Sequence, residues 1–224
     1  MTQKITERIG REPSPLSARK LGTLTIGQAP RSDITPILRQ HVPTIQLEEA
    51  GLLDNLLDDA IQSQYGPNDS EAVLITKLLD GRSVELSAQK VRNGLQTKLD
   101  ALERAGCDVI LLLCTGQFPG LYCKDAWLVE PDQIIPEATS ALIQDRLLGV
   151  IVPLESQINS ESGKWQRLSR TPLFAAASPY DDSSAGLRAA GWLLKSRGAN
   201  ALLLDCIGFT EEHRCELARV SNLP

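Results

Sequence analysis

Apolar and polar stretches alternate along this chain in a way that predicts strands and helices in turn. We expect strands at residues 21–26, 44–48, 73–79, 83–85, 108–113, 148–152, 173–177 and 199–204. We expect helices at residues 30–40, 52–61, 87–106, 136–144, 155–168, 184–197 and 211–219. Strands that alternate with crossover helices are typical of a mainly parallel sheet, so the pattern predicts an α/β protein.

Turn and capping signals support two of these elements. Asp80-Gly81 lies between two short strands and predicts a hairpin turn. Ser87 suits the N-cap of the long helix that follows, and Gly106 suits its C-terminal end. The apolar residues of this helix fall on one face, as helical spacing requires; they are Val91, Leu95, Leu99 and Leu102.

The strongest signal along the chain is an internal repeat. Residues 106–116 align without a gap onto residues 198–208, at an offset of 92 residues. Each copy holds a glycine, an Asp or Asn two residues later, an apolar strand, a cysteine and a second glycine. A weaker echo links residues 21–25 to residues 148–152. The repeat predicts two similar half-domains with a cleft between them.

The repeat also suggests where the lobes lie. We expect a first α/β lobe over residues 21–144 and a second over residues 145–224. Residues 1–20 are polar, lack the apolar stretch of a signal peptide, and are expected to form a disordered arm. The sequence stops at Pro224, where a further strand and helix would be expected, so the second lobe is predicted to be short of both.

Cys114 and Cys206 each follow a repeated strand and precede a glycine-containing turn. In open α/β sheets the ligand site lies beyond the carboxyl ends of the strands. Backbone N–H groups in such turns favour a carboxylate or phosphate. We therefore take both cysteines as candidate catalytic residues, with candidate substrate-binding neighbours at Thr115, Gly116, Gln117, Ile207 and Gly208.

Two thiols that face one ligand from opposite sides suit one kind of reaction. Stereoinversion at a carbon next to a carbonyl needs a base on one face and an acid on the other. N–H donors and a helix N-terminus can lower a thiol pKa from about 8.5 toward working pH, where general acid–base catalysis is most effective. The alternative is that each cysteine is a small apolar core residue. The matched pair favours the functional interpretation, whereas Cys107, Cys123 and Cys215 lack such support and are expected in the core or on the surface.

Three further segments carry candidate chemistry. Gly27, Gln28 and Arg31 follow the first strand, and Arg31 could pair bidentately with a substrate carboxylate or be a solvated arginine on a capped helix. The loop at residues 178–182 could contact a ligand or serve as an ordinary capping loop. His213 could tune Cys206 or be an exposed helical histidine.

Composition excludes several classes of protein. The chain has 224 residues, 42% of them hydrophobic and 23% charged, with a formal net charge of −5. It has no basic footprint for nucleic acid and no apolar run of the roughly 20 residues that a membrane helix needs. Five cysteines and two histidines lack the spacing of a zinc site or a disulfide scaffold. We expect a soluble cytoplasmic protein; the sequence leaves a homo-oligomer open.

Several motifs resemble those of the AroM family, within the aspartate/glutamate/hydantoin racemase superfamily. The likeness extends from about residue 21 to residue 224. It includes the Leu-Thr-Ile-Gly start, Asp-Val-Ile-Leu-Leu, Val-Glu-Pro at 129–131, Gly-Val-Ile-Val-Pro at 149–153 and Leu-Asp-Cys-Ile-Gly-Phe at 204–209. Residues 114–121 also resemble the first-cysteine loop of hydantoin racemases.

The resemblance implies two Rossmann-like lobes and chemistry that needs no cofactor. It implies racemisation or isomerisation of a small carboxylate-like substrate, with Cys114 and Cys206 as the acid/base pair and Thr115 as a substrate-binding neighbour. Asp205 departs from the racemase pattern, because a small or apolar residue usually precedes the second cysteine, and a carboxylate there raises a thiol pKa. A non-catalytic small-molecule binder and a thiol redox sensor are the alternatives.

Overall fold

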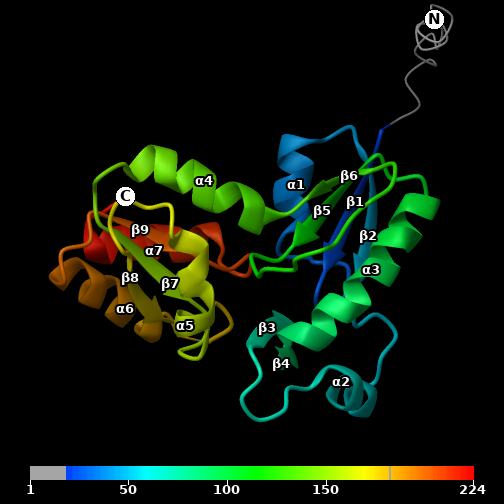
Figure 1. The fold of residues 1–224 in the computed structure, drawn as a ribbon, viewed down its shortest axis with the longest axis horizontal. Coiled ribbons are helices and arrows are strands. Elements are labelled where there is room, and N and C mark those ends of the chain that lie inside the picture. Colours follow the sequence, from blue (N-terminus) through cyan, green and yellow to red (C-terminus); the bar gives the residue numbers. More distant parts are fainter. Residues whose placement is uncertain (1–18, 182) are drawn as a thin grey trace, which may run out of the picture.

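The computed structural model describes residues 19–181 and 183–224, which form two lobes that each contain a parallel sheet (Figure 1). The predicted α/β class, with mainly parallel sheets in two lobes, is confirmed. Most of the expected N-terminal arm, residues 1–18, lies outside the described residues, as does residue 182 of the 178–182 loop.

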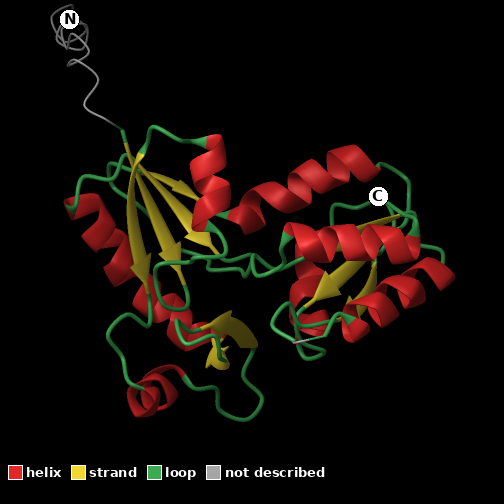
Figure 2. Ribbon diagram, turned by 180° about the vertical axis from the view of Figure 1, so that it is seen from behind, coloured by secondary structure: helices red, strands yellow, loops and turns green. Residues whose placement is uncertain are grey.

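The first lobe is a four-stranded sheet in the order β2-β1-β5-β6. Its strands are β1 (Lys20–Thr25), β2 (Gln46–Gly51), β5 (Val109–Leu113) and β6 (Trp127–Val129), and all of the pairings are parallel. Helix α3 (Ala88–Arg104) packs its predicted apolar face into one core with Leu24, Ile110 and Leu112 (Figure 2). The helix therefore buries the side of the sheet toward which β1 and β5 point their apolar side chains.

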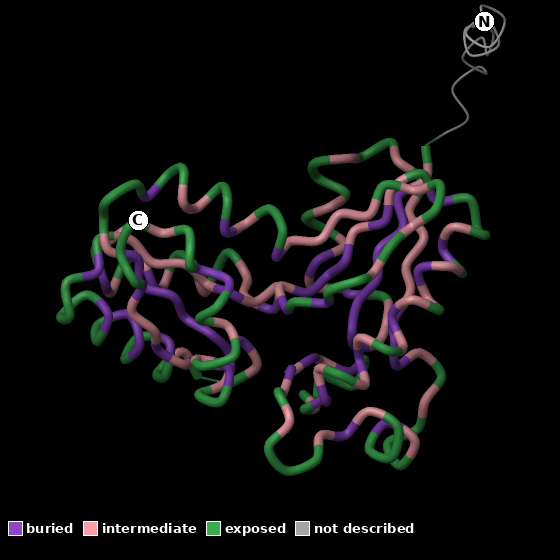
Figure 3. Tube along the Cα trace, in the orientation of Figure 1, coloured by how far each residue is buried: buried purple, intermediate pink, exposed green. Residues whose placement is uncertain are grey.

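The second lobe is a three-stranded parallel sheet in the order β8-β7-β9. Strands β7 (Leu148–Val152), β8 (Leu173–Ala176) and β9 (Ala201–Leu204) are bounded closely as predicted. All five residues of β7 are buried (Figure 3). Since successive strand residues point to opposite faces, Val150 enters one core cluster and Ile151 the other. Burial on both faces explains why this strand is a continuous apolar run.

Helices cover both faces of the second sheet. Helix α6 (Ala185–Ser196) and helix α7 (Glu211–Ser221) cover the face of Ile151. Helix α4 (Pro131–Ile143) and the 3-10 helix η2 (Ser162–Trp165) cover the opposite face. Helix α4 runs between the lobes in Figure 1, and its Ile143 packs in the second lobe's core, although the sequence assigned this segment to the first lobe.

The repeat extends to the hydrogen-bond register of the two sheets. Leu21 pairs with Val109 in the first lobe, and their repeat equivalents, Leu148 and Ala201, pair in the second. Gly106 and Gly198, which end α3 and α6, both have positive φ, at 84° and 94°. Both therefore adopt the left-handed conformation that terminates a helix, which favours glycine.

The first lobe carries an insertion that the second lacks within the described residues. Strands β3 (Val73–Lys77) and β4 (Ser83–Ser87) form the predicted antiparallel hairpin, with Gly81 at a φ of 91° in its turn. Helix α2 (Asp58–Tyr65) precedes it, and Ser87 caps α3 through the backbone N–H of Lys90 at 3.3 Å, as predicted. The hairpin reaches the gap between the lobes and there contributes to the site.

Several predicted helix boundaries are wrong for local reasons. The helix expected from residue 30 begins at α1 (Thr35–His41), because residues 31–34 form a turn closed on the Arg31 carbonyl. Residues 52–55 are not helical, since the N–H of Leu52 bonds to the carbonyl oxygen of Thr25 at the end of β1 and that of Leu53 to the carbonyl oxygen of Gly27. Helix α4 begins at Pro131 instead of residue 136, because a proline suits the first helical position.

Two other stretches differ from the prediction. The helix expected at residues 155–168 is shorter and consists of α5 (Gln157–Glu161) followed by η2. Strand β6 was missed, since three residues are too few for a recognisable alternation. In the part of the chain that the structure describes, no helix has the length and apolar character needed to cross a membrane.

Candidate functional site

The two copies of the repeat place Cys114 and Cys206 in equivalent backbone positions. Cys114 directly follows β5, and Cys206 follows β9 after one residue. Each sulfur accepts the backbone N–H of the glycine two residues later, at an N···S distance of 3.4 Å for both Gly116 and Gly208. The turn that the sequence repeats is thus the same structure in both lobes.

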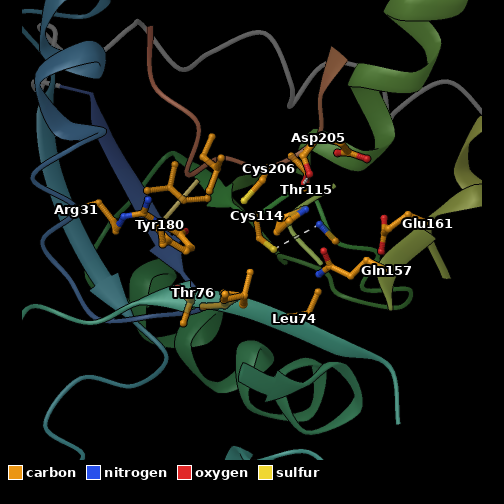
Figure 4. A pocket seen from close by; sticks show the side chains of 16 residues that line it. Arg31, Leu74, Thr76, Cys114, Thr115, Gln157, Glu161, Tyr180, Asp205 and Cys206 are labelled. Carbon is orange, nitrogen blue, oxygen red and sulfur yellow. Dashed lines mark hydrogen bonds between the residues drawn. The ribbon is translucent and has the colours of Figure 1, made fainter. Parts of the chain in front are cut away.

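Both cysteines line one cavity between the lobes. The first lobe contributes Ile26, Arg31, Leu113, Thr115 and Gly116, and the hairpin adds Leu74, Ile75 and Thr76. The second lobe contributes Pro153, Gln157, Glu161, Tyr180, Asp205 and Ile207. In Figure 4 the cysteine side chains lie at the centre, with Arg31 and Tyr180 on one side and Gln157 and Glu161 on the other. The two repeats therefore deliver their thiols to a shared space.

This cavity is narrow. It holds about 430 Å³ of space free of atoms, its open mouth included, but the centre of a water molecule can reach only about 30 Å³ of it. The enclosed interior of the cavity therefore has room for about two water molecules. A ligand of several heavy atoms can enter only if the surrounding loops move apart.

The thiol pKa values differ from the expectation for an activated cysteine. Burial raises the pKa of Cys114 to about 12 and that of Cys206 to about 11. The glycine N–H groups lower both values, as the sequence suggested, but desolvation of the thiolate is the larger effect. Asp205 also raises the pKa of Cys206, whereas the charge of Arg31 and the hydroxyl of Tyr180 lower it. Both thiols are therefore protonated at neutral pH in this closed state.

Arg31 lies beside Cys206 but has a partner of its own. Its side chain is buried and makes two hydrogen bonds to Asp33, at 2.8 Å from Nε and 2.6 Å from Nη2. Burial raises the pKa of Asp33, and the hydrogen bonds and charge of Arg31 outweigh it and hold that pKa below its usual value. Because Asp33 occupies the bidentate edge of the guanidinium, only the remaining N–H groups can face a ligand.

Tyr180 follows β8 and closes the same side of the cavity. Burial raises its pKa, so its hydroxyl is a proton donor. A Cβ atom at Gly208 would lie only 2.5 Å from the Tyr180 hydroxyl oxygen, so glycine at this position is what lets the ring reach Cys206's turn. The 178–182 loop, which the sequence left open between ligand contact and capping, thus places one side chain in the cavity wall.

A buried cluster of charges lies beside the cysteine turns. The Lys164 ammonium contacts the Asp205 carboxylate at 2.8 Å, the Glu161 carboxylate at 2.5 Å and the Thr115 carbonyl oxygen at 2.9 Å. Asp132 is also buried nearby, and burial raises its pKa. Asp205 departs from the racemase pattern, and its carboxylate raises the pKa of the neighbouring thiol. In the structure this carboxylate is paired with the Lys164 cation.

Four of the other sequence candidates do not line the cavity; they are Gly27, Gln28, Gln117 and Gly208. Gly27 packs against the hairpin, where a Cβ atom would come 2.4 Å from the Thr76 hydroxyl oxygen. Gln28 accepts the N–H of Leu79 at 2.9 Å and so ties the loop after β1 to the hairpin. Gln117 is exposed. The cavity lining does include Thr115, Gly116 and Ile207.

His213 and the remaining cysteines take structural positions. The His213 Nδ1 atom accepts the backbone N–H of Thr210 at 2.9 Å and so caps α7, and burial lowers the pKa of this histidine. Cys107 is buried in the first core, Cys123 packs against that core, and Cys215 is exposed. Among the described residues, no group of three His, Cys, Asp or Glu side chains is arranged to hold a metal ion.

Sequence reasoning missed the contributions of the hairpin and of α5. Leu74 and Leu78 lie on the same buried face of the hairpin as Thr76. Thr76 is polar and yet only 1% exposed. A threonine on an otherwise apolar buried face was a usable signal. Gln157 and Glu161 had no such signal, because polar residues on a short helix are ordinarily solvated.

Comparisons with known proteins agree with this geometry. The family model described as AroM protein matches residues 21–224. No curated protein matches the sequence.

Three solved structures resemble the fold. Aspartate racemase from Picrophilus torridus has a TM-score of 0.56 and 11% identity, covering 92% of this chain and 87% of that one. Allantoin racemase from Klebsiella pneumoniae has a TM-score of 0.53 and 13% identity, covering 92% and 81%. Glutamate racemase from Aquifex pyrophilus has a TM-score of 0.55 and 13% identity, covering 90% and 76%. At these identities the likeness concerns the fold.

Proposed function

This chain belongs to the AroM family, and we propose that it is a racemase- or isomerase-type enzyme that works without a cofactor. In this proposal Cys114 and Cys206 form an acid/base pair that acts on a small carboxylate-like substrate. The observation that carries the proposal is that two thiols from the two repeats line one cavity. The racemase fold supports it, since that fold is shared with three racemases.

The proposed reaction conserves protons at every step. The Cys206 thiolate takes the proton from the carbon next to the carboxylate, which leaves a carbanion stabilised as an enolate. The Cys114 thiol then donates its proton to the opposite face of that carbon and becomes the thiolate. The product is the mirror-image centre, and the enzyme is now set for the reverse reaction. Another turnover in the same direction requires that Cys114 regain a proton from water and Cys206 lose one to it.

The environment of the two thiols favours Cys206 as the one that loses its proton first. Its pKa of about 11 is the lower of the two, and Arg31 and Tyr180 both stabilise its charged form. In the closed state its thiolate fraction at pH 7 is only about 10⁻⁴ by the Henderson–Hasselbalch relation. A thiolate of high pKa is nevertheless a strong base, which suits a weakly acidic C–H bond. Water that enters with a substrate would relieve part of the desolvation that raises the pKa.

The test is exchange of the substrate's α-proton with solvent deuterium. Enantiopure α-amino and α-hydroxy acids are incubated in D₂O with the wild type, Cys114→Ser and Cys206→Ser, and followed by NMR and chiral chromatography. We expect each serine variant to lose racemisation by at least about 10³-fold, because a serine hydroxyl is a much weaker acid than a thiol. The two variants should lose exchange for opposite enantiomers, since each thiol serves one face.

Cys123→Ser is the matched control, because Cys123 is a half-buried thiol of the first lobe that does not line the cavity. It should keep wild-type exchange. Loss of exchange in the control together with the two variants would point to damaged folding and contradict the assignment of roles.

The raised thiol pKa values favour a second candidate, a non-catalytic small-molecule binder that keeps the cleft. The same acids distinguish the two. Binding measured by calorimetry without any deuterium exchange supports the binder and overturns the enzyme.

A further inference from the structure

Lys164 is a buried cation that contacts the turns of both cysteines. Its side chain is 2% exposed, on the short helix η2 of the second lobe. The ammonium donates to the carbonyl oxygen of Thr115, the residue after Cys114, at 2.9 Å. It also pairs at 2.8 Å with the carboxylate of Asp205, the residue before Cys206. One side chain therefore joins the two turns across the gap between the lobes.

A second contact also joins the two cysteine turns. The Thr115 hydroxyl donates to the backbone carbonyl oxygen of Asp205 at 3.3 Å. Thr115 and Asp205 are thus linked directly and also through Lys164. Because the sulfur of each cysteine is held by its own turn through the glycine N–H, the position of one turn relative to the other sets the relation between the two thiols.

The charges around Lys164 make this contact hard to replace. Asp205 and Glu161 share the one ammonium. Burial raises the pKa of Glu161, the nearby charge of Asp132 adds to that rise, and Lys164 opposes it. Burial also raises the pKa of Asp132, which Lys164 in turn lowers. Burial lowers the pKa of Lys164, but Asp205 and Glu161 outweigh it and keep the lysine charged. Without the ammonium, a buried carboxylate at Asp205 would have no opposite charge, which is strongly unfavourable.

We propose that Lys164 is a positioning residue, whose ammonium holds the Cys114 and Cys206 turns in one fixed arrangement around the cavity and keeps both thiols out of water. This role deepens the proposed function, on which it rests for its purpose, since two thiols must face one carbon centre at the same time. The protection of the thiols, however, can be measured without any substrate.

The experiment is alkylation of each cysteine by iodoacetamide as a function of pH, resolved by peptide mass spectrometry. In the folded Lys164→Met variant the turns separate and water reaches both sulfurs. Desolvation is the largest cause of both raised thiol pKa values. The charge of Lys164 lowers the pKa of Cys114, but by less than desolvation raises it. Relief of burial should therefore dominate, so we expect the midpoints of Cys114 and Cys206 to fall by at least about one pH unit. Their alkylation rates at pH 8 should rise by about tenfold or more.

Internal and matched controls separate this effect from unfolding. Cys107 is buried in the first core and does not line the cavity, so its alkylation should not change in the Lys164→Met variant. Lys90→Met removes another lysine that donates to a backbone carbonyl, that of Gly66 at 2.6 Å, far from either cysteine turn, and should leave both profiles as in the wild type. Lys164→Arg keeps the positive charge and should restore a large part of the protection.

If Lys164→Met does not fold, the double variant Lys164→Met with Asp205→Asn serves instead, because it removes both members of the buried pair together. Its informative readout is Cys114, which is not adjacent to the Asp205 change. Unaltered Cys114 and Cys206 profiles would overturn the proposal, and so would a parallel rise in Cys107, which indicates a general structural role. Absence of deuterium exchange would contradict the proposed function while leaving the alkylation result to stand by itself.

Discussion

The two copies of the strand–cysteine–glycine turn have the same backbone but different surroundings. Both cysteine sulfurs accept a glycine N–H at 3.4 Å. Cys114 is covered by apolar residues of its own lobe and of the hairpin, and burial raises its pKa to about 12. Burial also raises the pKa of Cys206, to about 11, and there the charge of Arg31 and the hydroxyl of Tyr180 oppose the rise. The repeat thus gives the two cysteines the same backbone position, while elements outside the repeat, such as the hairpin, give the two sulfurs different chemical surroundings.

The largest expected effect that tests this comparison is the pH dependence of stability. Each thiol has a folded-state pKa above its unfolded value of about 9, so above pH 9 the unfolded chain loses protons that the folded chain keeps. The free energy of unfolding should therefore fall as pH rises, by about 1.4 kcal/mol per pH unit for each thiol. Below pH 9 neither thiol contributes a slope.

Urea unfolding at pH 8, 9, 10 and 11 measures this slope in the wild type, Cys114→Ala and Cys206→Ala. Between pH 9 and 11, each variant should show a fall in unfolding free energy that is smaller than the wild type's by the contribution of one thiol. Slopes identical to that of the wild type would show that the thiols are not desolvated as described.

The next effect compares the two turn glycines. A Cβ atom at Gly208 would lie 2.5 Å from the Tyr180 hydroxyl oxygen, whereas at Gly116 the nearest atom is a Leu74 methyl carbon at 3.1 Å. We expect Gly208→Ala to destabilise the protein by about 2–3 kcal/mol and Gly116→Ala by about 1 kcal/mol, by analogy with overpacked cores. Denaturant midpoints at constant m-value measure the difference. Equal losses would contradict the asymmetric packing of the turns.

The smallest effect compares the helices that precede the two repeated strands. Ser87 accepts the N–H of Lys90 and caps α3, whereas Ser184, the N-cap of α6, makes no such side-chain hydrogen bond within the described chain. Ser87→Ala should cost about 1 kcal/mol, a typical loss for an N-cap, and Ser184→Ala should cost little. Thermal unfolding of both variants tests this. A larger loss at Ser184 would mean that the second helix is capped in another way.

Sequence reasoning was most successful where a pattern is local. The hairpin turn at Gly81, the N-cap at Ser87 and the boundaries of β7 follow from residue preferences within a few positions, and the structure confirms them. It failed where distant contacts decide, as at Leu52 and Leu53, whose N–H groups bond to the carbonyl oxygens of Thr25 and Gly27. The same limit applies to the cavity, since Gln157 and Glu161 reach it only because the second lobe packs against the hairpin.

The repeat by itself determined that two cysteines would occupy equivalent turns at the carboxyl ends of two parallel strands, because hydrophobic periodicity and turn glycines act over short stretches of chain. The tertiary structure alone decided which groups surround each sulfur and how strongly burial opposes its ionisation. Desolvation and charge pairing depend on atoms far apart in sequence, such as Lys164 and Thr115, and these meet only when the lobes pack together.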